Sequence, residues 1–265
     1  MGYDKMAYDY DYFVNEILRL TQIDLSSYKQ NQMKRRIDAF IMRHNSKGYD
    51  DFIALVRRDK ALLEEFVEYI TINVSEFYRN PEQWKFLTDE VFPKLIQRFG
   101  NRLTIWSAAC STGDEPYSLV MALSKYVPLS QIKVIATDLS DEIIEKAKIG
   151  MYGHKSVTSV PPEYKEKYFK KNGDFYQISD EIKRCVEFKK HNLLKDPFIK
   201  QCNLIVCRNV LIYFTEEAKD ETFVKFYDSL AKGGILFIGS TEQILNYKSI
   251  GYVRKSNFFY EKPAD

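Results

Sequence analysis

The first seventy residues carry hydrophobic side chains at helical spacing. The clearest case is segment 30–45, in which Met33, Ile37, Phe40 and Ile41 lie at positions i, i+4, i+7 and i+8. No segment before Leu103 has the composition and alternation of a β-strand. The pattern therefore predicts a small all-α N-terminal domain, whose other helices fall around residues 13–20, 52–56 and 62–70.

At Leu103 short apolar runs begin to alternate with helical segments. The helical segments are 116–126, 140–150 and 216–234, and the last of them ends at a pair of glycines. Strands that alternate with helices predict an α/β domain with a doubly wound, mostly parallel, Rossmann-like sheet. The predicted strands are 103–109, 132–138, 186–193, 203–209, 235–240 and 256–262.

Two local signals divide the chain further. Asn80-Pro81 disfavours helix at Asn80 and allows a new helix to begin at Pro81. The dipeptide Asn172-Gly173 is a strong hairpin signal. We expect a helical domain over 1–72, a linker over 73–90 and the α/β domain over 91–265, with a small β insertion at about 161–191.

Composition narrows the function classes. The 39 Lys and Arg residues nearly balance the 37 Asp and Glu residues, and a net charge of +2 gives no case for nucleic-acid binding. The four cysteines and three histidines are scattered, so we expect no metal site, and free thiols fit a reducing cytoplasm. No apolar signal-peptide core opens the chain, and no run approaches the ~20 apolar residues of a membrane span. We expect a cytoplasmic protein without membrane insertion, and a monomer, because no long apolar seam remains unassigned.

The loop after the first predicted strand carries the first chemical signal. A dinucleotide enzyme would have G-x-G-x-x-G there, but this loop reads ACSTGDEP with the single glycine Gly113. Asp114 and Glu115 at the helix start repel a pyrophosphate and favour a positively charged ligand without phosphate, such as S-adenosylmethionine. The alternative is that they only complement the helix dipole. Asp138 ends the next strand and suits a ribose diol, although capping of the following helix also explains it.

Several segments from the linker onward form a distinctive set. They are NVSEFYRN (73–80), WSAACSTGDEPYSL (106–119), IATDLS (135–140), HNLL (191–194) and CRNVLIYF (207–214). In this order, behind a helical N-terminal part, the chain resembles the CheR family of chemotaxis receptor methyltransferases over nearly its whole length. It departs from the family at Tyr78, where phenylalanine is usual, and at Asp114, where glutamate is frequent. The resemblance implies that S-adenosylmethionine is held by Asn73, Ser75, Arg79, Glu115, Asp138, Asn192, Leu193, Arg208 and Asn209.

The same resemblance implies the reaction. A methyl group passes from S-adenosylmethionine to glutamate side chains of methyl-accepting chemotaxis receptors, leaving S-adenosylhomocysteine. A glutamate, with a reference pKa of about 4.3, is ionised at neutral pH, so no general base is required. Arg79 and Tyr213 look like the residues nearest the transferred methyl group, with Arg79 orienting the carboxylate. Without the motif, Tyr213 would be interpreted as a core aromatic within the apolar run 210–214.

The predicted helix at 30–45 offers a surface for the receptor. Arg35, Arg36 and Arg43 fall within an arc of about 100° on the helix. Residues 29–47 hold six basic side chains and one acidic side chain, Asp38. The cytoplasmic helical bundle of the receptors bears the acidic acceptor side chains, so the resemblance favours docking by charge complementarity, against the alternative of a solvated helix face. In some family members the β insertion binds a receptor tail peptide, but the short turn here predicts no strong binding of that kind.

Three other functions compete with this one. A methyltransferase with another acceptor, such as nucleic acid or a small molecule, would share the cofactor loop, but the chain has RNVLIYF where base methyltransferases carry an Asn/Asp-Pro-Pro-aromatic segment. A non-catalytic cofactor-binding regulator would be expected to have lost some of the site residues. A nicotinamide oxidoreductase is disfavoured by the acidic, single-glycine loop.

Overall fold

The computed structural model describes residues 2–71 and 75–264, with side chains from Tyr10 onward. The chain separates into two compact units. The helical unit comprises Met1–Asn73 and Tyr213–Lys219, and the α/β unit comprises Val74–Ile212 and Asp220–Asp265. None of the helices within the described ranges is long and apolar enough to cross a membrane.

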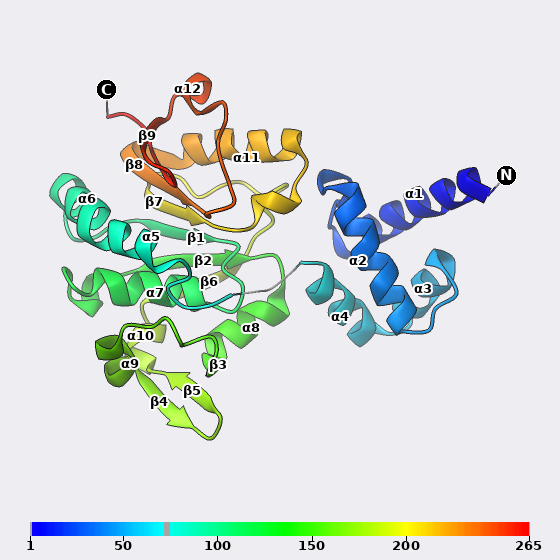
Figure 1. Ribbon diagram of the computed structural model, residues 1–265, viewed down its shortest axis with the longest axis horizontal. Helices are drawn as coiled ribbons and strands as arrows, with labels where there is room; N and C mark the ends of the chain where they lie inside the picture. The colour runs from blue at the N-terminus through cyan, green and yellow to red at the C-terminus, as the bar shows by residue number, and fades with distance from the viewer. Residues whose placement is uncertain (1, 72–74, 265) are drawn as a thin grey trace. The chain divides into compact units, whose positions relative to one another are not determined.

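The helical unit packs its helices around a cluster of phenylalanine rings. Phe66 lies at its centre, with ring centroids 5.4 Å from Phe40 and 5.1 Å from Phe52. The predicted apolar face of segment 30–45 is confirmed, because Met33, Ile37, Phe40 and Ile41 are all buried. The elements are α1 (Gly2–Thr21), η1 (Leu25–Ser27), α2 (Gln30–Arg43), α3 (Tyr49–Val56) and α4 (Lys60–Ile70) (Figure 1).

A short segment from much later in the chain joins the helical unit. The 3-10 turn η4 (Leu211–Tyr213) leads into it, and Phe214 forms an isolated antiparallel bridge with Tyr28. The main-chain N–H of Lys29 donates to the carbonyl of Tyr213 at 2.9 Å. Tyr213–Lys219 therefore belongs with the helical unit, although the sequence on both sides of it belongs to the α/β unit.

The α/β unit is built on one seven-stranded sheet with the order β6-β2-β1-β7-β8-β10-β9. The first five strands in this order are parallel, and β10 and β9 are antiparallel. The predicted doubly wound, mostly parallel sheet is confirmed. Its strands are β1 (Ile105–Ala108), β2 (Val134–Asp138), β6 (Val186–Lys190), β7 (Cys202–Cys207), β8 (Leu230–Ile238), β9 (Val253–Ser256) and β10 (Phe259–Glu261) (Figure 1).

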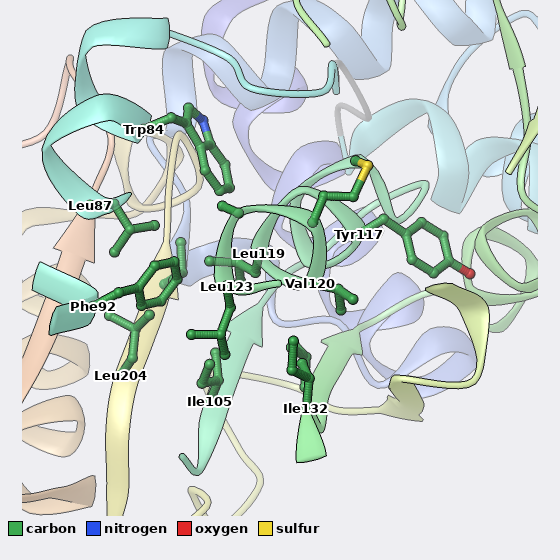
Figure 2. Close-up of a cluster of buried hydrophobic side chains, with 14 of the residues drawn as sticks. Trp84, Leu87, Phe92, Ile105, Tyr117, Leu119, Val120, Leu123, Ile132 and Leu204 are labelled. Carbon is green, nitrogen blue, oxygen red and sulfur yellow. The ribbon is translucent and has the colours of Figure 1, made fainter. Parts of the chain in front are cut away.

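Helices cover both faces of this sheet because side chains alternate along each strand. On one face, Trp106 of β1 packs its ring 5.5 Å from that of Phe226 in α11 (Glu216–Ser229). On the other face, Ile105 packs in a cluster with α7 (Asp114–Leu123) and with the helical stretch α5 (Pro81–Phe86), η2 (Leu87–Val91) and α6 (Phe92–Phe99). Figure 2 shows this cluster, in which Trp84, Leu87, Phe92, Ile105, Tyr117, Leu119, Val120, Leu123, Ile132 and Leu204 are labelled.

The β insertion has different bounds from those expected. Its hairpin at Asn172-Gly173 is confirmed, since β4 (Phe169–Asn172) pairs antiparallel with β5 (Phe175–Ile178). The small sheet also recruits β3 (Met151–Gly153), which lies before the predicted range, whereas β6 within that range belongs to the main sheet. The helices α8 (Asp141–Ile149), α9 (Pro162–Tyr168) and α10 (Asp180–Lys183) flank these strands in sequence.

Near the C-terminus the structure corrects the sequence interpretation twice. The predicted helix 216–234 ends at Ser229, and β8 begins at Leu230, which pairs with Cys202 of β7. Strand β9, which follows the short helix α12 (Tyr247–Ile250), has an exposed, charged pattern and was not predicted. In both places pairing with a neighbouring strand overrides the local pattern.

Candidate functional site

The order of the strands places a topological switch point at the centre of the sheet, and we call the region outside the carboxyl ends of β1, β2 and β7 the crevice. β1 lies between β2 and β7, so the connections that follow β1 and β7 leave in opposite directions. Open α/β sheets bind ligands outside the carboxyl ends of the strands at such a reversal. Glu115 lies after the end of β1, Asp138 ends β2 and Arg208 follows β7.

The loop after β1 is tightly wound. Ala109, Ser111 and Gly113 all have positive φ angles, of 58°, 50° and 88°. A Cβ on Gly113 would meet Ala147 Cβ at 3.0 Å and the Tyr117 ring at 3.1 Å, besides the strain of its backbone conformation. Glycine is therefore required where the loop enters α7, and one glycine is sufficient for this turn.

The two loop carboxylates have different environments. Asp114 is fully buried, with 0% exposure, and accepts hydrogen bonds from the hydroxyls of Ser156 and Thr112. Burial raises the pKa of Asp114, and these hydroxyls together with that of Ser75 act the other way. From the sequence, both carboxylates favour a cationic ligand and only Glu115 is predicted to hold the cofactor; in the structure Asp114 lies in the protein interior.

Glu115 is the loop carboxylate that contacts the segment after β7. Its Oε1 accepts a hydrogen bond from Ser107 Oγ at 2.8 Å, and its Oε2 lies 3.7 Å from Nη1 of Arg208. Burial raises the pKa of Glu115, while the charge of Arg208 and the Ser107 hydroxyl oppose that rise. The ion pair joins the connections after β1 and β7 across the crevice.

The second terminal nitrogen of Arg208, Nη2, makes hydrogen bonds within the protein. It donates to the carbonyl oxygen of Arg79 at 2.7 Å, to Asn80 Oδ1 at 3.0 Å and to Gln83 Oε1 at 2.8 Å. Burial lowers the pKa of Arg208; Glu115 beside it acts the other way, and the charge of Arg79 adds to the lowering. Arg208 thus anchors the turn in which Asn80 has a left-handed φ of 63° and Pro81 begins α5, as predicted.

Asp138 connects three segments at the end of β2. Its Oδ2 accepts a hydrogen bond from the main-chain N–H of Ser111 at 2.8 Å, and its Oδ1 accepts one from Ser140 N at 3.2 Å. The side chain that caps α8 is Ser140, not Asp138. The carbonyl of Asp138 accepts from the N–H of His191 at 2.8 Å, which brings the segment after β6 next to the same corner of the site.

That segment holds two further predicted cofactor residues. Asn192 Oδ1 accepts a hydrogen bond from Leu194 N at 2.9 Å, so this side chain shapes its own turn. Leu193 is buried. Other predicted cofactor residues come from the linker. Ser75 contacts Asp114, Arg79 lies near Arg208, and Asn73 falls outside the described residues.

The second predicted catalytic residue, Tyr213, belongs to the helical unit, whereas Arg79 belongs to the α/β unit. Tyr213 lines a hollow of about 420 Å³ together with the predicted recognition residues Arg35 and Arg36. Arg36 donates to the carbonyl of Tyr69, and its guanidinium lies 4.7 Å from the centre of that ring. Arg43 lies 5.1 Å from the same ring. The full lining consists of Lys29, Gln32, Met33, Arg35, Arg36, Ala39, Tyr69 and Tyr213.

Several residues that shape the site were missed in the sequence. Ser107 was detectable, because a polar side chain stands inside an otherwise apolar strand. Gln83 and Ser156 gave no local signal, since the groups they bind lie 125 and 42 residues away in the chain.

The residues at the crevice fit S-adenosylmethionine. Glu115 and Asp138 are carboxylates at adjacent strand ends, which suit a ligand with cationic groups and hydroxyls. Arg208, the positive charge beside them, is already paired within the protein. Oδ1 of Asn209 is buried and has no hydrogen-bond partner among the described residues, so an acceptor remains for a ligand donor.

Comparison with known proteins gives two family matches. Residues 73–258 match the CheR methyltransferase SAM-binding domain, and residues 8–71 match the CheR methyltransferase all-alpha domain. A "Chemotaxis protein methyltransferase" of Listeria innocua is 43% identical over 96% of this chain and 97% of its own. "Chemotaxis protein methyltransferase 2" of Vibrio cholerae is 31% identical over 95% of this chain and 90% of its own. A "Chemotaxis protein methyltransferase" of Borreliella burgdorferi is 31% identical over 89% of this chain and 88% of its own.

Proposed function

The chain belongs to the CheR family of S-adenosylmethionine-dependent methyltransferases, and on this premise we propose that it esterifies glutamate side chains of chemoreceptors. The relatives' names place the enzyme in chemotaxis. The acceptor is the proposed part. We assign it to the methyl-accepting receptors, at glutamates on their cytoplasmic helical bundle, and the enzyme therefore to the cytoplasm, as a monomer.

One observation carries the choice of a carboxylate acceptor. Tyr213, the tyrosine of the RNVLIYF motif, lines the same hollow as Lys29, Arg35 and Arg36. Arg35 and Arg36, together with Lys29, whose Nζ also lies 3.7 Å from Glu216 Oε1, form a local field beside the phenol that attracts a carboxylate and repels a cationic acceptor such as a lysine. The hollow therefore supports an acidic protein surface as the methyl acceptor.

The methyl transfer requires no acid or base group of the protein. Bound S-adenosylmethionine supplies an activated methyl group on a sulfonium sulfur. A new O–CH₃ bond forms at the glutamate oxygen as the C–S bond breaks, and the bond electrons stay on sulfur to give neutral S-adenosylhomocysteine. The glutamate is ionised at neutral pH, so no proton moves. The protein supplies position and exclusion of water, which are the effects that a bimolecular transfer needs.

We assign orienting roles to Arg79 and Tyr213. A guanidinium can donate two parallel hydrogen bonds to a carboxylate, which fixes the direction of the attacking oxygen. The phenol of Tyr213 can donate a third. Arg79 lies close enough to Arg208 to lower the pKa of that guanidinium, so it stands beside the cofactor crevice.

The proposal is tested by locating the methyl group on the acceptor. The enzyme is incubated with S-adenosylmethionine and receptor-containing membranes, and the receptor peptides are sequenced by tandem mass spectrometry. We expect methyl groups on glutamate side chains of the helical bundle. Methylation confined to lysine, arginine or another molecule would refute the acceptor assignment while leaving the methyltransferase family intact.

A further inference from the structure

One carboxylate holds the main chain that follows Arg208. Glu242 is only 5% exposed and lies in the connection after β8. Its Oε2 accepts hydrogen bonds from Asn209 N at 2.9 Å and from Gly239 N at 2.7 Å. Its Oε1 accepts from Val210 N at 3.0 Å and Leu211 N at 2.8 Å. Four main-chain N–H groups therefore share one side chain as their acceptor.

The loop depends on this side chain for its conformation. Asn209 has a positive φ of 61°, which leaves the regular strand geometry of β7. The main-chain N–H groups of residues 209–211 donate to Glu242 and not to a neighbouring strand. A buried N–H group without an acceptor lowers the stability of the folded protein. An ionised carboxylate accepts at both oxygens, whereas a glutamine amide would turn an NH₂ group toward two of the donors.

The segment that carries Glu242 is fitted to the same loop. A Cβ on Gly239 would lie 2.7 Å from Asn209 N and 2.8 Å from Glu242 Oε2. Only glycine allows the two main chains to come this close. We call the stretch GSTE at 239–242 the socket for residues 209–211. Gly239 allows the close approach of the two main chains, and the Glu242 carboxylate accepts the hydrogen bonds of the loop.

The socket contacts Asn209, which is a predicted cofactor residue. Asn209 carries the buried Oδ1 that has no partner among the described residues, and its Nδ2 makes only a 3.3 Å contact with Thr241 Oγ1 in the socket. The direction of the Asn209 side chain is thus set by its main chain, and its main chain is set by Glu242.

We propose that Glu242 is a positioning residue of the cofactor site, which fixes the loop 209–211 so that Asn209 faces bound S-adenosylmethionine. The inference rests on the proposed role of Asn209 in the site. It is independent of the proposed acceptor, because it concerns binding of the cofactor alone.

The test measures affinity for S-adenosylhomocysteine by calorimetry in full-length wild type, Glu242→Gln and a matched control. The control is Asn203→Ala, because Asn203 is also buried, accepts a main-chain N–H (that of Thr104, at 2.7 Å) and lies at the opposite end of β7. We expect Glu242→Gln to bind roughly tenfold more weakly or worse, since two donors lose their acceptor. Asn203→Ala should lose stability but keep wild-type affinity. Unchanged affinity in Glu242→Gln, or an equal loss in Asn203→Ala, overturns the proposal.

Hydrogen exchange adds a readout at the loop itself. Amides 209–211 should exchange faster in Glu242→Gln, while the β1 amides keep their wild-type rate; equal acceleration throughout would contradict positioning. If Glu242→Gln fails to fold, Gly239→Ala reaches the same loop, and full affinity there overturns the proposal. Asn209→Ala distinguishes the positioning role of Glu242 from the assignment of Asn209 to the cofactor site. Weak binding there with intact binding in Glu242→Gln refutes the positioning role alone, whereas unchanged binding in Asn209→Ala refutes the assignment of Asn209 to the site and the inference with it.

Discussion

Two adjacent carboxylates show how burial separates residues that look alike in sequence. Asp114 and Glu115 both stand at the start of α7, yet Asp114 is enclosed by hydroxyl donors and Glu115 faces Arg208 across the crevice. The difference follows from the helix, because successive side chains point about 100° apart. The first carboxylate is therefore enclosed in the protein interior, and the second is the one proposed for the ligand site.

Replacing Asp114 with alanine tests this division. The hydroxyls of Thr112 and Ser156 would lose their acceptor, so we expect the free energy of unfolding to fall by about 1–3 kcal/mol. Affinity for S-adenosylhomocysteine should change far less than it does in Glu115→Gln. Urea unfolding and calorimetry measure the two quantities. A large loss of affinity in Asp114→Ala without a loss of stability would place Asp114 in the ligand site after all.

Arg79 is the residue whose role bears most directly on the reaction. If it orients the glutamate, Arg79→Ala should lower kcat by roughly 10²-fold, in line with the cost of misplacing a reacting group, and leave cofactor affinity within about threefold. Arg79→Lys should recover little, because an ammonium cannot form the paired hydrogen bonds of a guanidinium. Steady-state kinetics and calorimetry decide the matter. A collapse of cofactor affinity would make Arg79 a cofactor residue instead.

At the scale of elements, α2 is the candidate for receptor recognition. It buries Met33, Ile37 and Phe40 on one side and presents Arg35 and Arg43 to solvent on another. This division agrees with the helical period of its sequence. Docking by charge would act mainly on the rate of association.

Charge reversal on α2 should therefore weaken receptor methylation. We expect Arg35→Glu with Arg43→Glu to raise KM for receptor membranes roughly tenfold at low salt and to flatten its dependence on ionic strength. Lys60→Glu is the control, since Lys60 lies on α4 and its side chain is 89% exposed. Initial rates across a salt series give the comparison. Equal effects of the control and the double variant, or none in either, would remove α2 from recognition.

The edge strand β6 carries a pH-sensitive pair of salt bridges. Glu187 lies 2.7 Å from both Lys133 and Lys189, and hydrogen bonds to these lysines lower its pKa from 4.5 to about 2. A lowered folded-state pKa stabilises the protein above pH 4.5, and this contribution is lost as pH falls toward 2. Wild type should therefore lose more stability than Glu187→Gln over this interval. Urea unfolding at a series of pH values measures it, and parallel curves would contradict the assignment.

The sequence predicted those elements whose burial pattern is local. The helical period of α2 and the buried runs of β1, β2 and β7 identified both units and the order of their strands along the chain. It also indicated Glu115 and Asp138, because each lies at the carboxyl end of a recognisable strand, whereas Arg208 was indicated only by the resemblance to the CheR family. It could not predict that β8 begins at Leu230, which depends on pairing with Cys202. Nor could it find the Glu242 socket, whose acceptor lies more than thirty residues from the loop that it holds.

At the scale of the whole molecule, the predicted site residues are divided between two units. Tyr213, Arg35 and Arg36 belong to the helical unit, and Arg79 and Glu115 belong to the α/β unit. The chain enters the helical unit a second time at Tyr213 and returns after Lys219. The match to the SAM-binding domain covers residues 73–258, and the residues proposed for recognition of the acceptor, Arg35 and Arg36, belong to the helical unit.

Glutamate esterification is tested most simply by the transfer of radiolabelled methyl from S-adenosylmethionine to receptor-containing membranes, followed by mild alkali. We expect label on the receptor band that alkali releases as volatile methanol, because carboxyl methyl esters hydrolyse under conditions that methylated amines survive. The Arg79→Ala enzyme, run in parallel, should leave the receptor almost unlabelled. Label that resists alkali, or an unlabelled receptor beside an enzyme that still binds the cofactor, would contradict glutamate esterification.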